Sequence, residues 1–189
     1  QERRGLEVFE NPEKANCAAC HPNRTSDGSP PLFTDFSYDN LGIPVNPQIA
    51  ALNGVAMMSI DYGLGTNARV IAENPSISMP DGQIVVESEA GKFKVMTLRN
   101  IAKTSPYGHN GFFQKLEDIV SFYALPIGSF VPEVDINVNN GELHDAIADK
   151  VSAEDIADLV AFLKTLTDGY RLASPYGNVP VPSLPEPMP

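Results

Sequence analysis

The stretch Asn16-Cys17-Ala18-Ala19-Cys20-His21-Pro22 places two thiols and an imidazole at the C-x-x-C-H spacing. On a helical turn, positions i, i+3 and i+4 share one face, so Cys17, Cys20 and His21 would point the same way. Two thiols on that face can form thioethers with the vinyl groups of one porphyrin, while the imidazole ligates its iron. The spacing therefore predicts one covalently attached haem c, with His21 as the proximal ligand.

Three other interpretations of the motif compete with haem attachment: a zinc half-site, a redox C-x-x-C pair and a chance occurrence. A zinc site would need a second pair of Cys or His, and Cys17 and Cys20 are the only cysteines in the chain. A thioredoxin-like redox motif would need a β-α-β context, whereas the residues after His21 are typical of a loop. Haem attachment is favoured, and because it uses both cysteines, no disulfide is expected.

The composition is acidic. The chain has 189 residues, enough for one domain with a sizeable core, and its 13 Lys and Arg against 24 Asp and Glu give a formal net charge of -11. Such a charge argues against binding to nucleic acid or to an anionic membrane. The sequence contains no transmembrane run and no signal peptide. Because haem is attached to this motif outside the bacterial cytoplasmic membrane, we expect a mature, exported chain in the periplasm.

Apolar spacing predicts helices on both sides of the motif. Residues 3–10 predict a short helix on which Leu6 and Phe9 share a face that would pack near the haem. Residues 116–123 have apolar or aromatic side chains at i, i+3, i+4 and i+7, and Pro126 and Gly128 would end this helix.

The last helix has the strongest local signals. Ser152 and Asp155 resemble a capping box, and they open a helix over about residues 153–167. Its expected buried stripe consists of Ile156, Leu159, Val160, Leu163 and Leu166.

The remaining segments read mostly as loops. Residues 23–47 are rich in Pro, Gly, Ser, Asp and Asn, and residues 49–60 predict either a short helix or irregular structure. Residues 83–86 and 93–95 predict short strands around a turn at 89–91, which would form a β-hairpin.

The order of these elements predicts a mainly α fold. We expect a class I cytochrome c-like domain, enlarged by long loops and a short β-hairpin, in which the first and last helices cross beside the haem. Residues 1–173 would form this single mono-haem domain. Residues 174–189 are rich in proline and predict an extended tail.

Three further segments resemble a known family. Residues 32–44, 92–102 with Thr-Leu-Arg-Asn, and 104–111 with Pro-Tyr-x-His-x-Gly are similar to the C-terminal haem domain of the bacterial di-haem cytochrome c peroxidases, including MauG-like members. The resemblance covers roughly residues 3–168. It implies a six-coordinate haem that passes electrons or stores oxidising equivalents. The family's N-terminal, peroxide-reacting domain and its relay Trp have no counterpart here, so we expect a stand-alone mono-haem relative or a second chain that supplies the peroxidatic half.

The resemblance also implies a position for the distal ligand. In the family this ligand ends the helix after the Pro-Tyr-x-His-x-Gly block and is Met in ordinary peroxidases and Tyr in MauG-like proteins. Counting from Pro106 leads to Tyr123, on a helix without Met. A tyrosinate ligand would favour Fe(III) and lower the reduction potential relative to a thioether.

Several alternatives for the distal position stay open. Tyr123 is otherwise only the last aromatic residue of an apolar helix face. Met96, where the family commonly has Pro, is the main competing ligand, and an open iron position is a further alternative. Three loop methionines are also candidates: Met57, Met58 and Met79.

Four more residues match family positions. Arg99 resembles an Arg beside a haem propionate, with an ordinary surface Arg as the alternative. His109 resembles a family His expected to form hydrogen bonds rather than to ligate iron. Thr104 and Pro106 match two backbone carbonyls that bind Ca²⁺ in the family, and they are candidate ligands for that ion.

Electron transfer through a six-coordinate haem is the leading functional hypothesis. The alternative is a peroxidase or MauG-like oxidase, acting alone or as the electron-transfer subunit of a two-haem complex. A haem-binding sensor or structural subunit is a third possibility. The expected partner is a redox protein, either a second haem-bearing chain or a second copy of this one.

Overall fold

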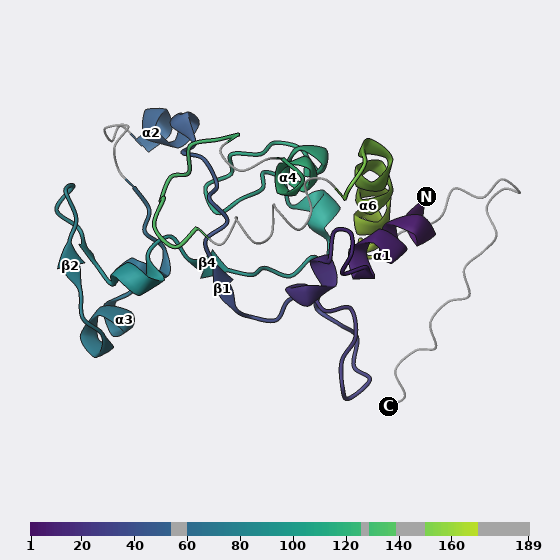
Figure 1. Cartoon of the computed structure of the whole chain (residues 1–189), viewed down its shortest axis with the longest axis horizontal. Coiled ribbons are helices and arrows are strands. Elements are labelled where there is room, and N and C mark those ends of the chain that lie inside the picture. Colours follow the sequence, from purple (N-terminus) through teal and green to yellow (C-terminus); the bar gives the residue numbers. More distant parts are fainter. Residues whose placement is uncertain (54–59, 126–128, 139–149, 170–189) are drawn as a thin grey trace, which may run out of the picture.

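The computed structural model describes residues 1–53, 60–125, 129–138 and 150–169, and it is mainly helical with long loops (Figure 1). This confirms the expected cytochrome c-like, mainly α fold with a short β-hairpin. The predicted tail and the helix-ending Pro126 and Gly128 lie outside the described residues. The described elements are α1 (Glu2–Glu10), η1 (Cys17–Ala19), β1 (Tyr38–Asp39), α2 (Pro47–Asn53), η2 (Leu64–Thr66), α3 (Ala68–Glu73), β2 (Ile77–Ser78), β3 (Ile84–Val85), η3 (Glu87–Glu89), β4 (Phe93–Lys94), η4 (Ile101–Lys103), α4 (Leu116–Tyr123) and α6 (Ala153–Thr165).

Helices α1 and α6 cross at one end of the molecule, and no two other described elements pack more extensively (Figure 1). A Cβ atom at Gly5 would lie 1.9 Å from the carbonyl oxygen of Asp158, far inside a normal contact distance. The two backbones can approach this closely only because residue 5 has no side chain. The crossing predicted from the sequence therefore depends on a glycine that the sequence analysis did not single out.

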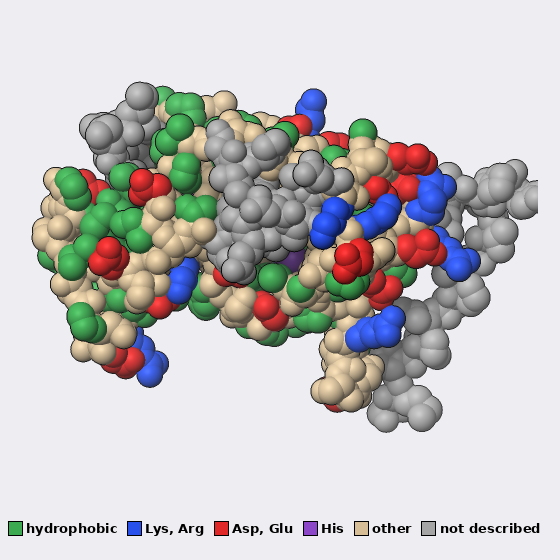
Figure 2. All heavy atoms as spheres, viewed as in Figure 1, with side chains coloured by type: hydrophobic (Ala, Val, Ile, Leu, Met, Phe, Trp, Pro, Cys, Tyr) green, Lys and Arg blue, Asp and Glu red, His purple; other side chains and the backbone are tan. Residues whose placement is uncertain are grey.

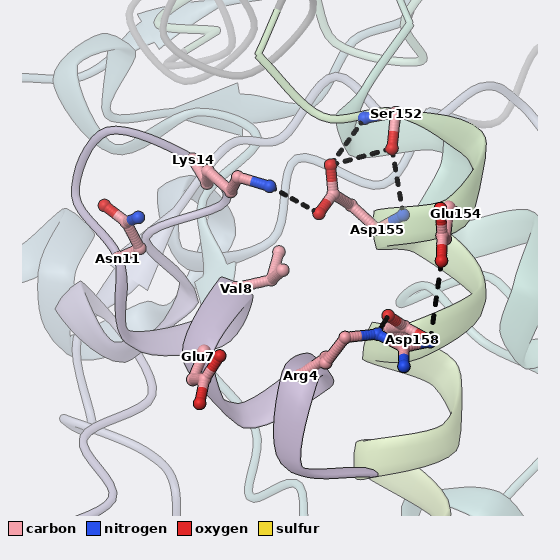
Figure 3. Close-up of a pocket in the computed structure, with 9 residues that line it drawn as sticks. All are labelled: Arg4, Glu7, Val8, Asn11, Lys14, Ser152, Glu154, Asp155 and Asp158. Carbon is pink, nitrogen blue, oxygen red and sulfur yellow. Dashed lines mark hydrogen bonds and ion pairs between the residues drawn. The ribbon is translucent and has the colours of Figure 1, made fainter. Parts of the chain in front are cut away.

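Charged side chains form ion pairs at the edge of this helix crossing (Figure 3). Arg4 donates two hydrogen bonds to the buried carboxylate of Asp158, at 2.6 and 3.0 Å, and Lys14 donates one to Asp155 at 2.6 Å. Burial would raise the pKa of Asp155, but the bonds from Lys14 and Ser152 outweigh burial and hold that pKa below its usual range. The hollow between the helices, about 380 Å³ in volume, is thus lined by charges that already have partners.

The predicted capping box is confirmed at the start of α6. The Ser152 hydroxyl accepts from the backbone N–H of Asp155, and the Asp155 side chain accepts from the backbone N–H of Ser152. Leu159, Val160 and Leu163 are buried as expected from the periodicity. Ile156, which was expected in the buried stripe, is only half-buried. The stripe instead includes Asp158 and Phe162, which face α1. The buried residues of α6 and its C-terminal cap are Asp158, Leu159, Val160, Phe162, Leu163 and Leu166.

Aromatic rings fill the core beside the crossing. The ring centroid of Phe9, which is fully buried, lies 5.1 Å from that of Phe162 and 6.1 Å from that of Phe33. Helix α4 adds Phe122, whose ring centroid lies 5.1 Å from that of Phe113. This core also packs against Cys17, so the C-x-x-C-H segment is seated directly on the aromatic cluster.

The strands pair differently from the predicted hairpin. Residues 84–85 and 93–94 are strands, but β3 pairs antiparallel with β2, and β4 pairs antiparallel with β1. The segment between β3 and β4 forms η3 rather than a tight turn, so it cannot bring the two strands side by side. The hairpin of the fold is β2–β3, and the second sheet joins segments more than fifty residues apart.

Residues 60–92 form a lobe with its own small core. Tyr62, Val85 and Ala90 are buried there together with Val134 from a later loop. Elements α3 and β2 of this lobe lie at the end of the molecule opposite α1 and α6 (Figure 1). Helix α2 occupies the start of the segment for which a short helix or irregular structure was expected.

The surface at the α1–α6 end mixes charges of both signs (Figure 2). Its basic side chains form ion pairs with neighbouring carboxylates rather than a basic field: Arg3 with Glu7, Arg4 with Asp158 and Glu154, Lys14 with Asp155, Arg24 with Glu10, and Lys164 with Glu117. Among the described helices, none combines the length and the apolar character that crossing a membrane requires.

Replacing Gly5 tests the helix crossing. We expect Gly5→Ala to lower the free energy of unfolding by about 3 kcal/mol, because the new methyl group would overlap the Asp158 carbonyl and force the helices apart. Urea unfolding followed by circular dichroism measures this change. Arg3→Ala, on the exposed face of the same helix, is the control and should change it by less than about 0.5 kcal/mol. Equal effects of the two substitutions would contradict the close approach.

Candidate haem site

The C-x-x-C-H segment forms a single helical turn, as its spacing predicts. Cys17 opens the 3-10 helix η1, and the backbone N–H of His21 donates to the Cys17 carbonyl at 2.9 Å. The turn starts at Asn16, whose φ of 47° lies in the left-handed region that asparagine tolerates better than most residues. The local backbone thus brings Cys17, Cys20 and His21 to one side of the turn.

The imidazole of His21 is oriented by the loop that follows. His21 Nδ1 lies 2.8 Å from the backbone carbonyl oxygen of Phe33. A carbonyl can only accept, so Nδ1 carries the proton and the lone pair is on Nε2, the atom free to bind a metal. Burial lowers the pKa of His21, although the Phe33 carbonyl and the charge of Asp35 act in the opposite direction. A neutral imidazole with a fixed tautomer is suited to ligate haem iron.

The two thiols do not fit the competing interpretations. Burial raises the pKa of Cys17 to about 12, and burial together with the charges of Asp39 and Asp35 raises that of Cys20. A redox C-x-x-C pair has a lowered thiol pKa, and a structural zinc site needs four ligands. Within the described parts of the chain, no three His, Cys, Asp or Glu residues come together as a metal-ion site. The residues present therefore fit a covalently held haem better than zinc or thiol exchange.

Tyr123 is the last residue of α4. Burial is the largest cause that raises the pKa of its phenol, and the next causes are the charges of Cys17, Cys20 and Asp39. The phenol is therefore within electrostatic reach of both thiols of the motif. A ferric ion bound at the phenol oxygen would act in the opposite direction, because its charge favours the phenolate.

Met96 lies two residues beyond Lys94, the last residue of β4. Its side chain is 62% exposed.

The two candidate ligands differ in exposure. Burial is the largest cause that raises the pKa of the Tyr123 phenol, whereas the Met96 side chain is 62% exposed. This difference favours Tyr123 over Met96 as the distal candidate. Met79 packs against the second core around Tyr62, while Met57 and Met58 fall outside the described residues.

Arg99 lies beside the residue that orients His21. Its Nε donates to the Pro31 carbonyl at 2.9 Å, and its guanidinium carbon lies 5.2 Å from the centroid of the Phe33 ring. This position next to the motif is compatible with the propionate contact that the sequence analysis expects, and that contact stays a prediction.

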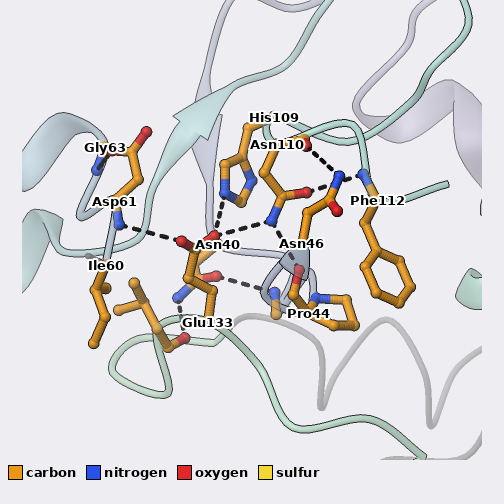
Figure 4. Close-up of polar contacts among 12 residues, drawn as sticks. Asn40, Pro44, Asn46, Ile60, Asp61, Gly63, His109, Asn110, Phe112 and Glu133 are labelled. Carbon is orange, nitrogen blue, oxygen red and sulfur yellow. Dashed lines mark hydrogen bonds and ion pairs between the residues drawn. The ribbon is translucent and has the colours of Figure 1, made fainter. Parts of the chain in front are cut away.

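His109 forms the hydrogen bond that was expected of it, with Glu133 as the partner (Figure 4). The distance from His109 Nε2 to Glu133 Oε2 is 2.8 Å, and the imidazole stacks on Phe93 with ring centroids 3.6 Å apart. Glu133 also accepts from the Asn110 side chain at 3.0 Å and from the backbone N–H of Asp61 at 3.3 Å. One carboxylate thus links three loops and the strand β4.

Asn40 plays a similar part next to Glu133 (Figure 4). Its buried side chain donates to the carbonyls of Val134 and Ile136, at 3.0 and 2.8 Å, and accepts from the backbone N–H of Gly42. The sequence analysis missed both Glu133 and Asn40, because each is an isolated polar residue in a loop and no spacing marks its distant partners.

The calcium candidates lie in the exposed loop after η4. The hydroxyl and the backbone N–H of Thr104 both donate to the Ile101 carbonyl, and Pro106 lines a hollow of about 430 Å³ together with His109 and Asn46. Calcium binding through these carbonyls stays a prediction.

Comparison with known proteins identifies similar haem enzymes. No family model matches the chain. It is 34% identical over 170 residues to the methylamine utilization protein MauG of Paracoccus denitrificans, a match that covers 81% of this chain and 39% of that protein. It is 27% identical over 206 residues to the cytochrome-c peroxidase IdrP1 of a Pseudomonas species, covering 96% of this chain and 45% of the relative.

Solved structures give the same result. The diheme peroxidase BthA of Burkholderia thailandensis matches with a TM-score of 0.64 and 29% identity, over 89% of this chain and 42% of BthA. A MauG-like protein associated with microbial copper homeostasis matches with a TM-score of 0.52 and 25% identity, over 88% of this chain and 46% of that one. The chain therefore spans less than half the length of the relatives it matches.

The acid stability of the protein tests the role of Glu133. Burial opposes ionisation of its carboxyl, but the hydrogen bonds from His109, Asp61 and Asn110 outweigh burial and hold the pKa below its ordinary value of 4.5. A lowered folded-state pKa adds stability that is fully present above the unfolded-state pKa and is lost as the pH falls through the folded-state pKa. We expect Glu133→Gln to unfold about 1 kcal/mol more easily at neutral pH, a value that allows for solvent screening.

The difference between Glu133→Gln and the wild type should shrink as the pH falls below about 4.5. Urea unfolding at a series of pH values measures it, with Glu87→Gln on the exposed η3 helix as the control. A Glu133→Gln protein with the acid sensitivity of the wild type would exclude the ionised carboxylate as the link between these loops.

Proposed function

Because this chain belongs to the family of MauG and the bacterial di-haem cytochrome c peroxidases, we propose that it holds one covalent haem c between the C-x-x-C-H turn and Tyr123 and transfers electrons through it. The chain is a haem protein of this family and corresponds to a C-terminal-like part of its relatives. Cys17 and Cys20 would form the thioethers, and Arg99 would approach a propionate. When bound, haem supplies a one-electron Fe(III)/Fe(II) couple.

The hydrogen bond from His21 Nδ1 to the Phe33 carbonyl carries the proposal. It fixes the tautomer, leaves Nε2 for the iron and strengthens the imidazole as a donor. On the other side, the Tyr123 phenol would be the sixth ligand in its deprotonated form. Two protein ligands would leave no site for an external molecule, which suits electron transfer rather than bond chemistry.

Peroxidase or MauG-like oxidase activity is the second candidate function, because IdrP1 and BthA are described as peroxidases and a further relative is MauG. This chain would act alone or as the electron-transfer subunit of a two-haem complex. Peroxide cleavage needs an open iron position and an acid–base residue above it. If Tyr123 is the sixth ligand, it would occupy that position, which favours electron transfer as the first candidate.

The proposed haem protein would also have a redox partner, a periplasmic location and a calcium site. A redox protein would exchange electrons with the haem, either a second haem-bearing chain or a second copy of this chain. Haem attachment at this motif supports a periplasmic location. Thr104 and Pro106 would offer backbone carbonyls to a calcium ion, an oxygen-ligand preference typical of that metal.

Substitution of Tyr123 tests the distal ligand. We expect the ferric wild type to give a low-spin electron paramagnetic resonance signal without the near-infrared Met-to-iron charge-transfer band. In Tyr123→Phe the signal should change, and the reduction potential should rise by more than about 59 mV, a tenfold change in the Fe(III)/Fe(II) equilibrium, because an anionic ligand is lost.

Two control variants accompany Tyr123→Phe. Tyr38→Phe and Met96→Leu, which each change an exposed side chain, should leave the spectrum and the potential unchanged. A charge-transfer band that disappears in Met96→Leu would assign the distal position to Met96 instead of Tyr123.

Carbon monoxide separates the two candidate functions. The ferrous protein should not bind CO within seconds, and the ferric protein should not consume peroxide faster than free haem, because both iron positions would carry protein ligands. Stopped-flow spectroscopy follows both reactions. Rapid CO binding by the wild type, together with peroxide turnover, would move the peroxidase function to first place.

A further inference from the structure

The loop after the haem motif carries backbone conformations that side chains rarely adopt. Phe33, whose carbonyl accepts from His21, has a φ of 55°, and Phe36 has a φ of 64°. Bulky residues avoid this left-handed region unless the surrounding structure holds them there. The loop must therefore be fixed by contacts from outside it, since its own sequence favours other conformations.

Residues 95–99 supply these contacts. The Thr97 hydroxyl donates to the Leu32 carbonyl, and Arg99 Nε donates to the Pro31 carbonyl at 2.9 Å. In the opposite direction, the Thr34 hydroxyl donates to the Val95 carbonyl. The peptide unit before Phe33 and the side chain of Thr34 after it are thus held by one short segment of the chain.

Thr97 is the residue on which two of these contacts depend. Its hydroxyl donates to Leu32 and also accepts from the backbone N–H of Arg99 at 3.1 Å. The same oxygen therefore fixes the carbonyl that precedes Phe33 and the backbone from which the Arg99 side chain reaches Pro31. Arg99 in turn lies 5.2 Å from the Phe33 ring, which is buried against Phe9.

We propose that Thr97 is a positioning residue for the proximal histidine: its hydroxyl, through the Leu32 and Phe33 peptide, aims the Phe33 carbonyl at His21 Nδ1 and so sets the reduction potential of the haem. The inference rests on the proposed haem attachment at His21. A well-aligned carbonyl strengthens the hydrogen bond that Nδ1–H donates. The imidazole then becomes a stronger electron donor to the iron, which favours Fe(III). Without the hydroxyl, the carbonyl can turn away and the potential rises.

The test compares three variants of the haem-loaded protein. Thr97→Val has nearly the shape of Thr97 without its hydroxyl, Thr97→Ser keeps the hydroxyl, and Thr66→Val removes a hydroxyl that bonds to Gly63 in the distant lobe. The measurements are haem content by pyridine haemochrome, reduction potential by spectroelectrochemistry, and the ferric electron paramagnetic resonance g-values.

We expect Thr97→Val to shift the Fe(III)/Fe(II) equilibrium three- to tenfold toward Fe(II), where tenfold corresponds to about 59 mV, with altered g-values and normal haem content. Thr97→Ser and Thr66→Val should match the wild type. A merely structural role would lower stability without moving the potential. An unchanged potential in Thr97→Val, or an equal shift in Thr97→Ser, would overturn the inference.

The fallback variant Thr97→Ala and the wild type itself complete the set of proteins to be measured. If Thr97→Val does not load haem, Thr97→Ala, which adds no atoms to the loop, is judged by the same measurements. The wild type is measured first, and a wild type without covalent haem would overturn the proposed function itself. Normal haem in the wild type with unshifted variants would overturn only the role of Thr97.

Discussion

The backbone contact between Gly5 of α1 and Asp158 of α6 is the constraint on which the haem site depends. It lets Phe9 and Phe162 meet at 5.1 Å, and the ring of Phe33 rests on both of them. The carbonyl of the same Phe33 orients His21. The crossing of the terminal helices is thus connected to the proximal imidazole through a single residue, which uses its side chain for packing and its backbone for the hydrogen bond.

Elements whose sequence signals lie within one or two turns of the chain were predicted correctly from the sequence. The C-x-x-C-H spacing, the apolar period of α4 and the capping box at Ser152 depend on residues within one or two helical turns, and all three elements form as predicted. The β-hairpin was assigned to the wrong segments, because β1 and β4 are joined by register alone and no turn marks their pairing. Glu133 could not be found at all, since its partners come from two distant loops.

The choice between Tyr123 and Met96 as the distal ligand also depends on long-range structure that local sequence patterns do not contain. Helical periodicity places Tyr123 on the apolar face of α4 but cannot say what that face meets. Only the folded structure shows that the Met96 side chain is 62% exposed, while burial and the charges of Cys17 and Cys20 act on the Tyr123 phenol. The distal preference therefore depends on long-range packing that no local pattern specifies.

The long insertion of residues 60–92 has a structural part in the site despite its distance from the motif. It buries its own small core around Tyr62 and Val85. Two contacts connect this core to the rest of the protein: Asp61 N–H donates to Glu133, and Asn40 donates to the carbonyl of Val134. Glu133 holds His109, and the imidazole of His109 stacks on Phe93 of β4. Residues 95–99, which fix the loop at Phe33, begin directly after that strand. The lobe is thus connected, through Glu133, His109 and β4, to the segment that fixes the loop at Phe33, and in this chain long-range bonds between loops link the parts of the site.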